Sequence, residues 1–439
     1  MVSRPLFPGE MMPGQRVVIT GRGVVSPLGI GVEGHQRGLL AGRSVIRRSE
    51  RLSASGFPLS SAGEIPDETL KNSTALIPQR QKKLMSRAGI LAAIASMDAA
   101  REAKLEETEI DPNRVGIFLG TWLTFFSLSS FLRYLGDTES GREPRVMDSE
   151  KANLRCLETM NPVDYSLKVL PNLAAGHLAI FHRAQGCSRV IADCWRAGLL
   201  AVAQAAQAIG SGELDVILAG GTESPLEEGI FCDLCTLEVV ARDRGEPDPI
   251  CRPFDARRRG AVLGEGAGMV VLEERGHALR RGMTFFGEIT GSACSAPGPA
   301  GCPETALGLS MKKALLESKL DCGEVDFVHA NGDSTPDYDR AEWQAVKSIF
   351  GLHATAVPVT ATKSLHGHLL SASGAVELIS SLMMLQHGVI LPIANCDNPD
   401  PECGLDLVRD TPRVKSGMRS ALLNAFGLFG EAASLVIQR

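Results

Sequence analysis

The chain has 439 residues, of which 44% are hydrophobic and 22% are charged, and these proportions are typical of a globular protein with one or two large cores. A net charge of −6 without a long basic run argues against nucleic acid or an anionic membrane surface as a partner. The first residues lack the apolar core of a signal peptide, and no uncharged apolar run approaches the ~20 residues that span a bilayer, so we expect a cytoplasmic protein.

Strand and helix patterns alternate along the first half of the chain. Val17–Thr20 is a short apolar run that we expect to form a strand ending in a turn at Gly21 and Gly23. Residues 84–105 carry apolar positions at helical spacing, and an apolar strand follows at 115–120. The same alternation continues with a helix at 198–209 and strands at 214–219 and 268–273. This alternation predicts an α/β fold.

The second half repeats the theme, which indicates an internal duplication. We place the seam near 275–285, giving an N-terminal half at 16–280 and a C-terminal half at 281–439. Residues 136–165 are polar and irregular in pattern, so we expect a surface excursion or cap there. The second-half elements are helices at 303–318, 339–350 and 371–387 and strands at 325–330, 356–361, 419–425 and 432–438.

The cysteines argue against both disulfides and a metal centre. There are 11 of them, an odd number scattered through apolar and loop contexts. Cys232 and Cys235 have the spacing of metal ligands, but no second pair or histidine cluster accompanies them. We therefore expect no metal and no cofactor.

Seven blocks of the sequence resemble, in order, the signature blocks of the elongating β-ketoacyl-acyl carrier protein synthases. One such block would be weak evidence, but seven in order from about residue 16 to the end are strong. The resemblance implies the thiolase-like fold, a five-layered αβαβα arrangement of two duplicated halves that is normally dimeric. The blocks are VVITGRGVVSPLG (17–29), PNLAAGHLAI (171–180), LDVILAGGTES (214–224), RPFDARRRGAVLGEGAGMVVLEE (252–274), ANGDSTP (330–336), TKSLHGHLLSASGAVE (362–377) and NAFGLFG (424–430).

The resemblance places Trp195 where the family carries its nucleophilic cysteine, at the N-terminus of a buried helix. Counting forward from Gly186 and counting back from Gly220 both reach this residue without a gap. The alternative makes Cys194 the nucleophile, which requires a deletion and a compensating insertion and would turn the side chain about 100° around the helix. Because an indole is not a nucleophile at neutral pH, Trp195 cannot hold an acyl chain as a thioester.

The first histidine of the family is also displaced. This chain has His329, Ala330 and Asn331 where the family has Asn, Ala and His, so the resemblance implies that Asn331 takes the histidine's place without its charge. Positions two apart share one face of a strand, so we expect His329 to point to the site face about 7 Å further back. Asp333 replaces a threonine that in the family contacts the phosphopantetheine arm, whereas Thr335, the partner of that threonine, is retained.

Lys363 and His368 keep the family's Lys-x4-His spacing, with Glu377 on the following helix. One interpretation is a residual decarboxylation or oxyanion site. The other is structural: Lys363 and Glu377 form a buried ion pair, and His368 is a core histidine with its hydrogen bonds satisfied.

Two further segments depart from the family pattern. Phe429 replaces a glycine that lets the family's last loop move and present a backbone N–H to the oxyanion. The turn after residue 120 carries Trp122, Phe125 and Phe126, large side chains beside the expected acyl tunnel and dimer contact. In all, the last block departs from the family at Leu428, Phe429, Glu431 and Ala432.

These departures predict a chain that kept its scaffold and lost its chemistry. We expect a non-catalytic subunit, similar to a chain-length factor, that pairs with an active β-ketoacyl synthase in fatty-acid-like or polyketide biosynthesis. The expected partners are that synthase, or a second copy of this chain, and an acyl carrier protein. The alternatives are a malonyl-acyl carrier protein decarboxylase or another residual acyl-transfer enzyme that uses Lys363 and His368, and a homodimeric acyl-binding or regulatory protein.

Overall fold

One large sheet runs through the molecule. The computed structural model describes residues 15–54, 61–122, 128–139, 146–159, 167–237, 239–241, 251–298 and 301–439. The strands of the large sheet are β1 (Val17–Ser26), β2 (Gly29–Ile30), β5 (Val115–Gly120), β6 (Ser188–Ile191), β7 (Val216–Glu223), β8 (Gly266–Glu274), β9 (Gly287–Ser295), β10 (Phe327–His329), β11 (Pro358–Thr360), β13 (Asp406–Leu407), β15 (Ser420–Phe426) and β16 (Ala432–Gln438). They form a 12-stranded sheet in the order β13-β11-β10-β15-β16-β9-β1-β8-β7-β5-β6, with β2 paired to β1. Two small sheets pair β3 (Arg47–Arg48) with β4 (Ser61–Ala62) and β12 (Val389–Ile390) with β14 (Arg413–Val414).

The strand order reveals the duplication. When β13, the outermost strand of the second half, is left aside, the first half reads inward as β6-β5-β7-β8-β1 and the second half as β11-β10-β15-β16-β9. In each half the chain-order ranks are therefore third, second, fourth, fifth and first. Parallel and antiparallel pairs also fall at the same places in both halves. The halves meet where β1 pairs with β9, and the predicted α/β class with two similar halves is confirmed.

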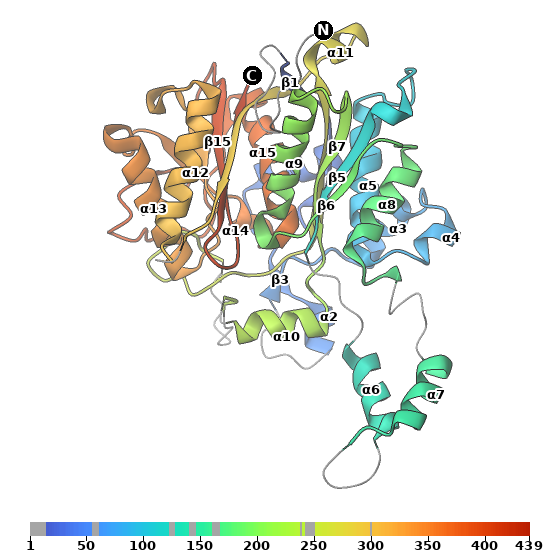
Figure 1. The fold of residues 1–439 in the computed structure, drawn as a ribbon. Helices are drawn as coiled ribbons and strands as arrows, with labels where there is room; N and C mark the ends of the chain where they lie inside the picture. The colour runs from blue at the N-terminus through green and yellow to red at the C-terminus, as the bar shows by residue number, and fades with distance from the viewer. Residues whose placement is uncertain are drawn as a thin grey trace.

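Helices cover both outer faces and fill the space between the two halves of the sheet. The central helices are α9 (Ala197–Gly210) and α15 (Ser373–His387), which pack against each other and against strands of both halves (Figure 1). Helices α5 (Arg87–Glu102) and α8 (Pro171–Phe181) cover the first half, and α12 (Pro303–Ser318) and α13 (Pro336–Phe350) cover the second. The smaller helices are α1 (Gly31–Ala41), α2 (Glu50–Ala54), α3 (Asp67–Thr74), α4 (Gln79–Lys82), α10 (Glu228–Thr236), α11 (Arg275–Arg280) and α14 (Lys363–His366).

The first strand is longer than predicted. β1 continues through Gly21 and Gly23 to Ser26, and the turn follows at Pro27. The glycines do not end the strand, because their role is to admit a neighbour: a Cβ at either position would overlap the backbone of α5. The expected turn at Gly21 and Gly23 was therefore wrong, and the small side chains serve close packing of a helix on a strand.

The predicted excursion at 136–165 contains the end of one helix and the whole of another among its described residues. Helix α6 (Leu128–Thr138) and helix α7 (Ser149–Thr159) pack on each other and project from the body of the molecule (Figure 1). The polar pattern did not indicate these helices, in which many described residues are exposed, and the role of the segment as a surface excursion or cap stays a prediction. No helix among the described residues is long and apolar enough to cross a membrane.

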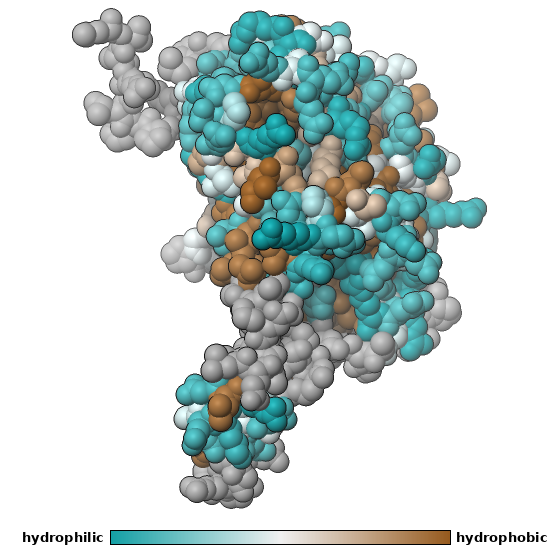
Figure 2. Space-filling model, turned by 90° about the vertical axis from the view of Figure 1, so that its right-hand side faces the viewer, coloured by the Kyte–Doolittle hydropathy of each residue, from teal (hydrophilic) through white to brown (hydrophobic). Residues whose placement is uncertain are grey.

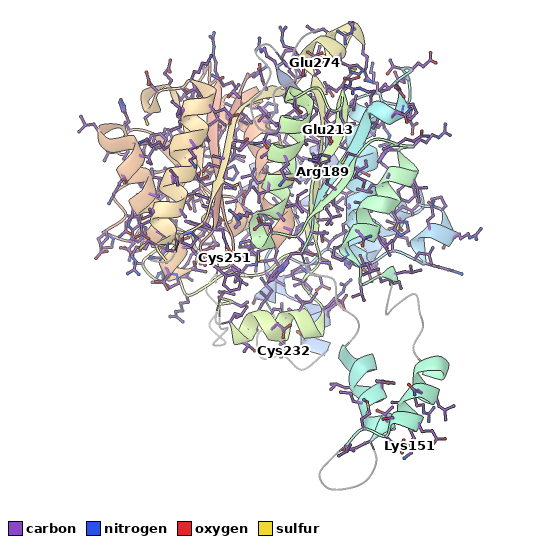
Figure 3. All side chains as sticks on the ribbon, viewed as in Figure 1. Lys151, Arg189, Glu213, Cys232, Cys251 and Glu274 are labelled. Atoms are coloured by element: carbon purple, nitrogen blue, oxygen red, sulfur yellow. The ribbon has the colours of Figure 1, made fainter. Side chains whose placement is uncertain are left out.

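The large sheet ends at β6, which lies on the side of α8. Arg189 on this strand forms an ion pair of 2.8 Å with Glu213, and the two side chains lie together near the sheet edge (Figure 3). The same side of the molecule carries apolar patches among polar residues (Figure 2). Leu170, just before α8, is 49% exposed, and Ile180 within α8 is 63% exposed.

Candidate functional site

Trp195 lies at the entrance to the central helix α9. β6 ends at Ile191, and a short 3-10 turn, η3 (Cys194–Arg196), leads directly into α9. The Trp195 side chain is 1% exposed. We call its apolar surroundings the Trp195 cluster, whose buried members are Leu52, Ala62, Trp195, Leu226, Ile230, Phe231, Leu234, Val240, Leu263, Leu370 and Leu428.

Two glycines lock the second half of the chain onto this entrance. A Cβ at Gly198 on α9, or at Gly221 on β7, would overlap the carbonyl oxygen of Ser371. The Ser371 hydroxyl donates a hydrogen bond of 2.9 Å to the carbonyl of Cys194. These contacts place the segment that begins at His368 directly against the start of α9.

His368 and Trp195 are in ring contact, with centroids 4.8 Å apart in an edge arrangement. The backbone N–H of Leu370 donates to Nδ1 of His368 at 3.0 Å, so the neutral ring carries its proton on Nε2. Burial, together with the charge of Lys363, lowers the pKa of His368 well below its usual value. Neither Nε2 of His368 nor Nε1 of Trp195 has a hydrogen-bond partner among the described residues. The predicted fully satisfied core histidine is therefore only half satisfied.

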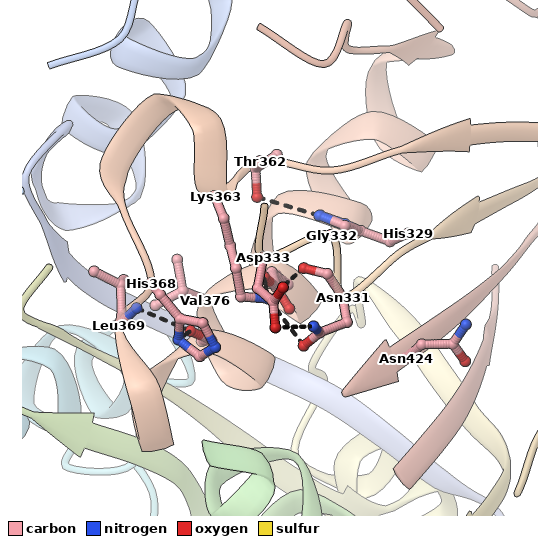
Figure 4. Close-up of polar contacts among 12 residues, drawn as sticks. His329, Asn331, Gly332, Asp333, Thr362, Lys363, His368, Leu369, Val376 and Asn424 are labelled. Carbon is pink, nitrogen blue, oxygen red and sulfur yellow. Dashed lines mark hydrogen bonds and ion pairs between the residues drawn. The ribbon is translucent and has the colours of Figure 1, made fainter. Parts of the chain in front are cut away.

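Lys363 has all of its donors engaged. Its Nζ lies 2.6 Å from the carbonyl of Asn331 and 3.3 Å from Asn331 Oδ1 (Figure 4). It also lies 2.6 Å from Glu377 Oε1. Lys363 and Glu377 are 1% and 2% exposed, so the predicted buried ion pair is present. An ammonium group has three protons, and these three acceptors leave none for a substrate.

Asn331 is likewise held by its neighbours. Its side-chain oxygen accepts from Lys363, and its Nδ2 donates to Asp333 at 3.2 Å (Figure 4). The same oxygen accepts from the backbone N–H of Phe426 at 3.3 Å. Asp333 is fully buried and also accepts from the hydroxyl and the backbone N–H of Thr335. The Asp333 carboxylate thus points into the protein, where it orients Asn331 rather than facing an arm that enters from solvent.

His329 lies on β10, two residues before Asn331. Its Nε2 is 3.2 Å from the Thr362 hydroxyl (Figure 4). Its Nδ1 is 2.7 Å from the Ser381 hydroxyl. Burial lowers the pKa of His329 to about 3, so the ring is neutral. Both of its nitrogens are therefore engaged, beside the residue that precedes Lys363 and one helical turn beyond Glu377 on α15.

Two buried acids on α13 were not singled out in the sequence. Glu342 accepts from the backbone N–H groups of Asn331 and Gly332, each at 2.9 Å, and burial raises its pKa to about 7. Asp339 accepts from the N–H of Phe254 at 2.7 Å, and burial raises its pKa well above the usual value. The signal was present as acidic positions three apart on the inner face of a predicted helix, where a carboxylate is unexpected.

The last loop closes over the Trp195 cluster. Leu428 is buried in that cluster, whereas Phe429 is 66% exposed. The backbone N–H of Phe429 donates to Glu431 Oε2 at 3.1 Å, and that of Gly427 donates to the Glu431 carbonyl at 2.6 Å. The N–H that the family would offer to an oxyanion is thus bonded within the loop.

Cys194 has the properties of an inert thiol. Burial is the main reason that its pKa is raised to about 11, and the nearby carboxylate of Glu431 acts in the same direction. A thiolate is therefore scarce at neutral pH. This chemistry weighs against the alternative in which Cys194 is the nucleophile.

Of the three aromatic side chains expected to fill the acyl tunnel, the structure describes one, Trp122. Trp122 is half-buried and packs against the Trp195 cluster, and its backbone N–H donates to the Glu223 carboxylate at 2.9 Å. Phe125 and Phe126 lie outside the described residues.

Cys232 is exposed on α10, away from Cys251 (Figure 3), and the described residues contain no group of three or more His, Cys, Asp or Glu side chains that could hold a metal ion.

A cavity of about 1000 Å³ opens beside α13, outside this closed centre. Thr335, Tyr338 and Phe429 are among the residues that line it. Thr335 begins α13, and its hydroxyl accepts from the N–H of Tyr338 at 3.2 Å. Tyr338 was missed in the sequence because the motif that includes Thr335 ends two residues before it.

Two family models match this chain. The model for the "Beta-ketoacyl synthase, N-terminal domain" matches residues 14–278, and the model for the "Beta-ketoacyl synthase, C-terminal domain" matches residues 286–397. The chain belongs to the β-ketoacyl synthase family. Membership confirms the predicted resemblance, and the layered arrangement is the thiolase-like ketosynthase fold.

Curated β-ketoacyl synthase relatives match over nearly their whole length. A "3-oxoacyl-[acyl-carrier-protein] synthase 2" of Synechocystis is 31% identical over 97% of this chain and 98% of its own. A "Nodulation protein E" of Rhizobium leguminosarum bv. trifolii is 33% identical over 97% and 99%. The "Granaticin polyketide putative beta-ketoacyl synthase 1" of Streptomyces violaceoruber is 33% identical over 97% and 98%.

Solved ketosynthase structures match in three dimensions. A β-ketoacyl synthase from Burkholderia phymatum superimposes with a TM-score of 0.84 at 29% identity, over 97% of this chain and 99% of that one. A second solved structure, "The ishigamide ketosynthase/chain length factor", gives a TM-score of 0.82 at 28% identity, with the same two coverages.

Proposed function

We propose that this chain is a non-catalytic ketosynthase-like subunit that pairs with an active β-ketoacyl synthase in fatty-acid-like or polyketide biosynthesis. The observation that carries the proposal is Trp195, a fully buried indole at the helix entrance where the family holds its nucleophile. Condensation requires a thioester on that residue, and no indole atom can form one.

The neighbouring groups support the same conclusion. Lys363 and Asn331 are hydrogen-bonded to each other, and their remaining polar atoms are hydrogen-bonded to Glu377, Asp333 and Phe426. A group that stabilises an oxyanion needs a donor aimed at empty space where the oxygen will lie. In this chain the donors of Lys363 and Asn331 are hydrogen-bonded within the protein, as expected of a site that has become part of the core.

Pairing is supported by the free end of the sheet. An edge strand beside exposed apolar side chains is a common docking surface, and β6 and α8 provide both within the described part of the chain. Two related ketosynthase folds can meet through matching surfaces of this kind. The 28% identical structure is, by its name, a ketosynthase together with a chain length factor, which is a precedent for such a pair.

The decarboxylase alternative has less support. It needs two polar groups on one substrate, and only His368 offers an unengaged N–H among the described family positions. Lys363, the other candidate, has no donor left.

The test is co-expression with an active synthase encoded beside this gene. We expect the two chains to co-elute from size-exclusion chromatography at micromolar concentrations, and condensation to require the synthase. Ile180→Glu should weaken the complex because it places a charge on the apolar edge surface. Leu316→Glu is the matched control, since Leu316 is equally apolar and 77% exposed but lies on α12 in the other half. Separate elution of the two wild-type chains would remove the basis for the proposal, and a stable homodimer would favour the acyl-binding or regulatory alternative.

A further inference from the structure

Tyr338 occupies the boundary between the outer cavity and the buried centre. Its side chain lines the cavity on one side and packs against the Trp195 cluster on the other. The first turn of α13 fixes its position, because the Thr335 hydroxyl caps the N–H of Tyr338. Tyr338, together with Val239, therefore lies between the open cavity and the buried cluster behind it.

The Tyr338 hydroxyl ties α13 to the last loop. It donates a hydrogen bond of 2.6 Å to the carbonyl of Leu428. Burial raises the pKa of Tyr338, so the phenol stays protonated and remains a donor. The ring lies 5.1 Å from the Phe426 ring and 6.4 Å from the Trp195 ring, measured between centroids. One hydrogen bond thus ties the loop at 427–431 to Tyr338, and the two ring contacts hold Tyr338 beside Trp195 and beside Phe426 of β15.

The closed arrangement leaves polar groups behind it without partners. Trp195 Nε1 and His368 Nε2 are buried N–H donors with no acceptor among the described residues. Water or a carbonyl oxygen would satisfy them if it could enter. A carbonyl oxygen of an amide chain that reached this centre would therefore find two N–H donors.

The charged residues that line the cavity also disfavour binding of a phosphate-bearing chain. Of the charged side chains that line it, Glu304, Asp337 and Glu402 are acidic and Arg340 is basic. Arg340 is paired with Asp337 at 3.0 Å. The remaining carboxylates would repel an anionic ligand.

We propose that Tyr338 is the residue that bars a pantetheine-type arm, a linear amide chain carrying a thiol and a phosphate, from the Trp195–His368 centre. The inference deepens the proposed function and rests on it: an acyl chain carried by the pair is then handled in the partner's pocket. It assigns the exclusion to one side chain and one hydrogen bond between α13 and the loop at 427–431.

The test measures how accessible Trp195 is in the full chain. The protein has 3 tryptophans, so Trp122→Phe with Trp343→Phe leaves Trp195 as the fluorescent reporter. We expect Tyr338→Ala to raise quenching by acrylamide severalfold, because it removes the wall of the cavity. Tyr338→Phe keeps the ring and loses the hydrogen bond, so it should give a smaller rise. Binding of acetyl-pantetheine, followed by calorimetry, should be absent in the wild type and appear in Tyr338→Ala.

Tyr134 provides a matched control, since its hydroxyl also donates to a backbone carbonyl, that of Ala152, at 3.2 Å. Tyr134→Ala and Tyr134→Phe should leave the quenching of Trp195 unchanged. If the reporter background fails to fold, ¹⁹F spectra of the 5-fluorotryptophan-labelled chain, assigned with Trp195→Phe, give the same readout. Unchanged quenching in Tyr338→Ala would overturn the proposal, and unchanged quenching in Tyr338→Phe alone would overturn the part assigned to the hydrogen bond. Neither readout needs a synthase or turnover, so a failure of the proposed Tyr338 barrier and a failure of pairing with a synthase are distinguishable.

Discussion

Lys363 holds two parts of the second half together through a single buried ammonium. It bridges Glu377 on α15 and Asn331 after β10. We expect Lys363→Met to lower the melting temperature, because loss of one partner of a buried ion pair typically costs about 3–5 kcal/mol. The double variant Lys363→Met, Glu377→Leu should recover part of the loss, since no unpaired carboxylate remains. Thermal unfolding followed by circular dichroism measures both. Unchanged stability together with loss of a malonyl decarboxylation activity would instead support the enzyme alternative.

Glu342 makes stability depend on pH. Burial raises its pKa from 4.5 to about 7, so between these values the folded state binds more protons than the unfolded state. Its contribution is therefore fully present below pH 4.5 and is lost as the pH rises through about 7. A shift of this size corresponds to about 3 kcal/mol.

Glu342→Gln should therefore flatten the fall of the unfolding free energy between pH 5 and pH 8, because the amide does not titrate. Denaturant unfolding at several pH values measures the slope. The exposed Glu106→Gln is the control and should leave it unchanged. An equal slope in wild type and Glu342→Gln would show that other groups, such as Asp339, cause the dependence.

At the scale of elements, the candidate site depends on how closely α9 approaches the segment at 368–373. Gly198 permits that approach, since a Cβ there would overlap the Ser371 carbonyl oxygen. We expect Gly198→Ala to destabilise the fold by about 1–3 kcal/mol, the usual cost of overpacking a core. Gly176→Ala on α8 is the control, because nothing lies within 4 Å of its Cβ position, and it should stabilise by about 0.5–1 kcal/mol. Chemical denaturation of both variants decides whether the contact is as tight as described.

The candidate centre exists only in the whole molecule. Trp195 follows β6 of the first half, whereas His368, Lys363 and Asn331 follow strands of the second half. These residues lie where parallel strands of the sheet reach their carboxyl ends, a common place for sites in α/β folds. A substitution at Trp195 therefore leaves the side chains that the second half supplies to the centre unchanged.

Restoring one residue should not restore chemistry. Trp195→Cys leaves Asn331 bound to Asp333 and leaves the cavity closed at Tyr338. Groups that act as a unit in a site are strongly non-additive, so we expect no condensation from this variant alone with acyl and malonyl carrier proteins. Product analysis by mass spectrometry checks the outcome, with an active synthase as the positive control. Measurable condensation by the single variant would contradict the importance assigned to the other departures.

The sequence by itself determined the fold class, the alternation of elements and the positions that can carry chemistry. The apolar run at 115–120 coincides with β5, because a strand buried on both faces needs an apolar residue at nearly every position. The Lys363–Glu377 pair was also predicted, since charges buried in a core require each other. Periodicity failed at α7, where a polar helix that packs on one neighbour carries a weak apolar pattern.

Only the tertiary structure decided what the polar atoms do. Spacing could not show that His329 turns to Ser381, that Leu370 sets the proton of His368 on Nε2, or that Tyr338 closes the centre by bonding to Leu428. Each of these contacts joins residues whose relation depends on side-chain torsions or on segments distant in the sequence. A hydrogen bond requires a narrow range of distance and angle between its two atoms, whereas burial of an apolar side chain requires only that the side chain lies on the correct face of its helix or strand. The hydrophobic pattern therefore specifies the scaffold, and the packed fold selects the partners.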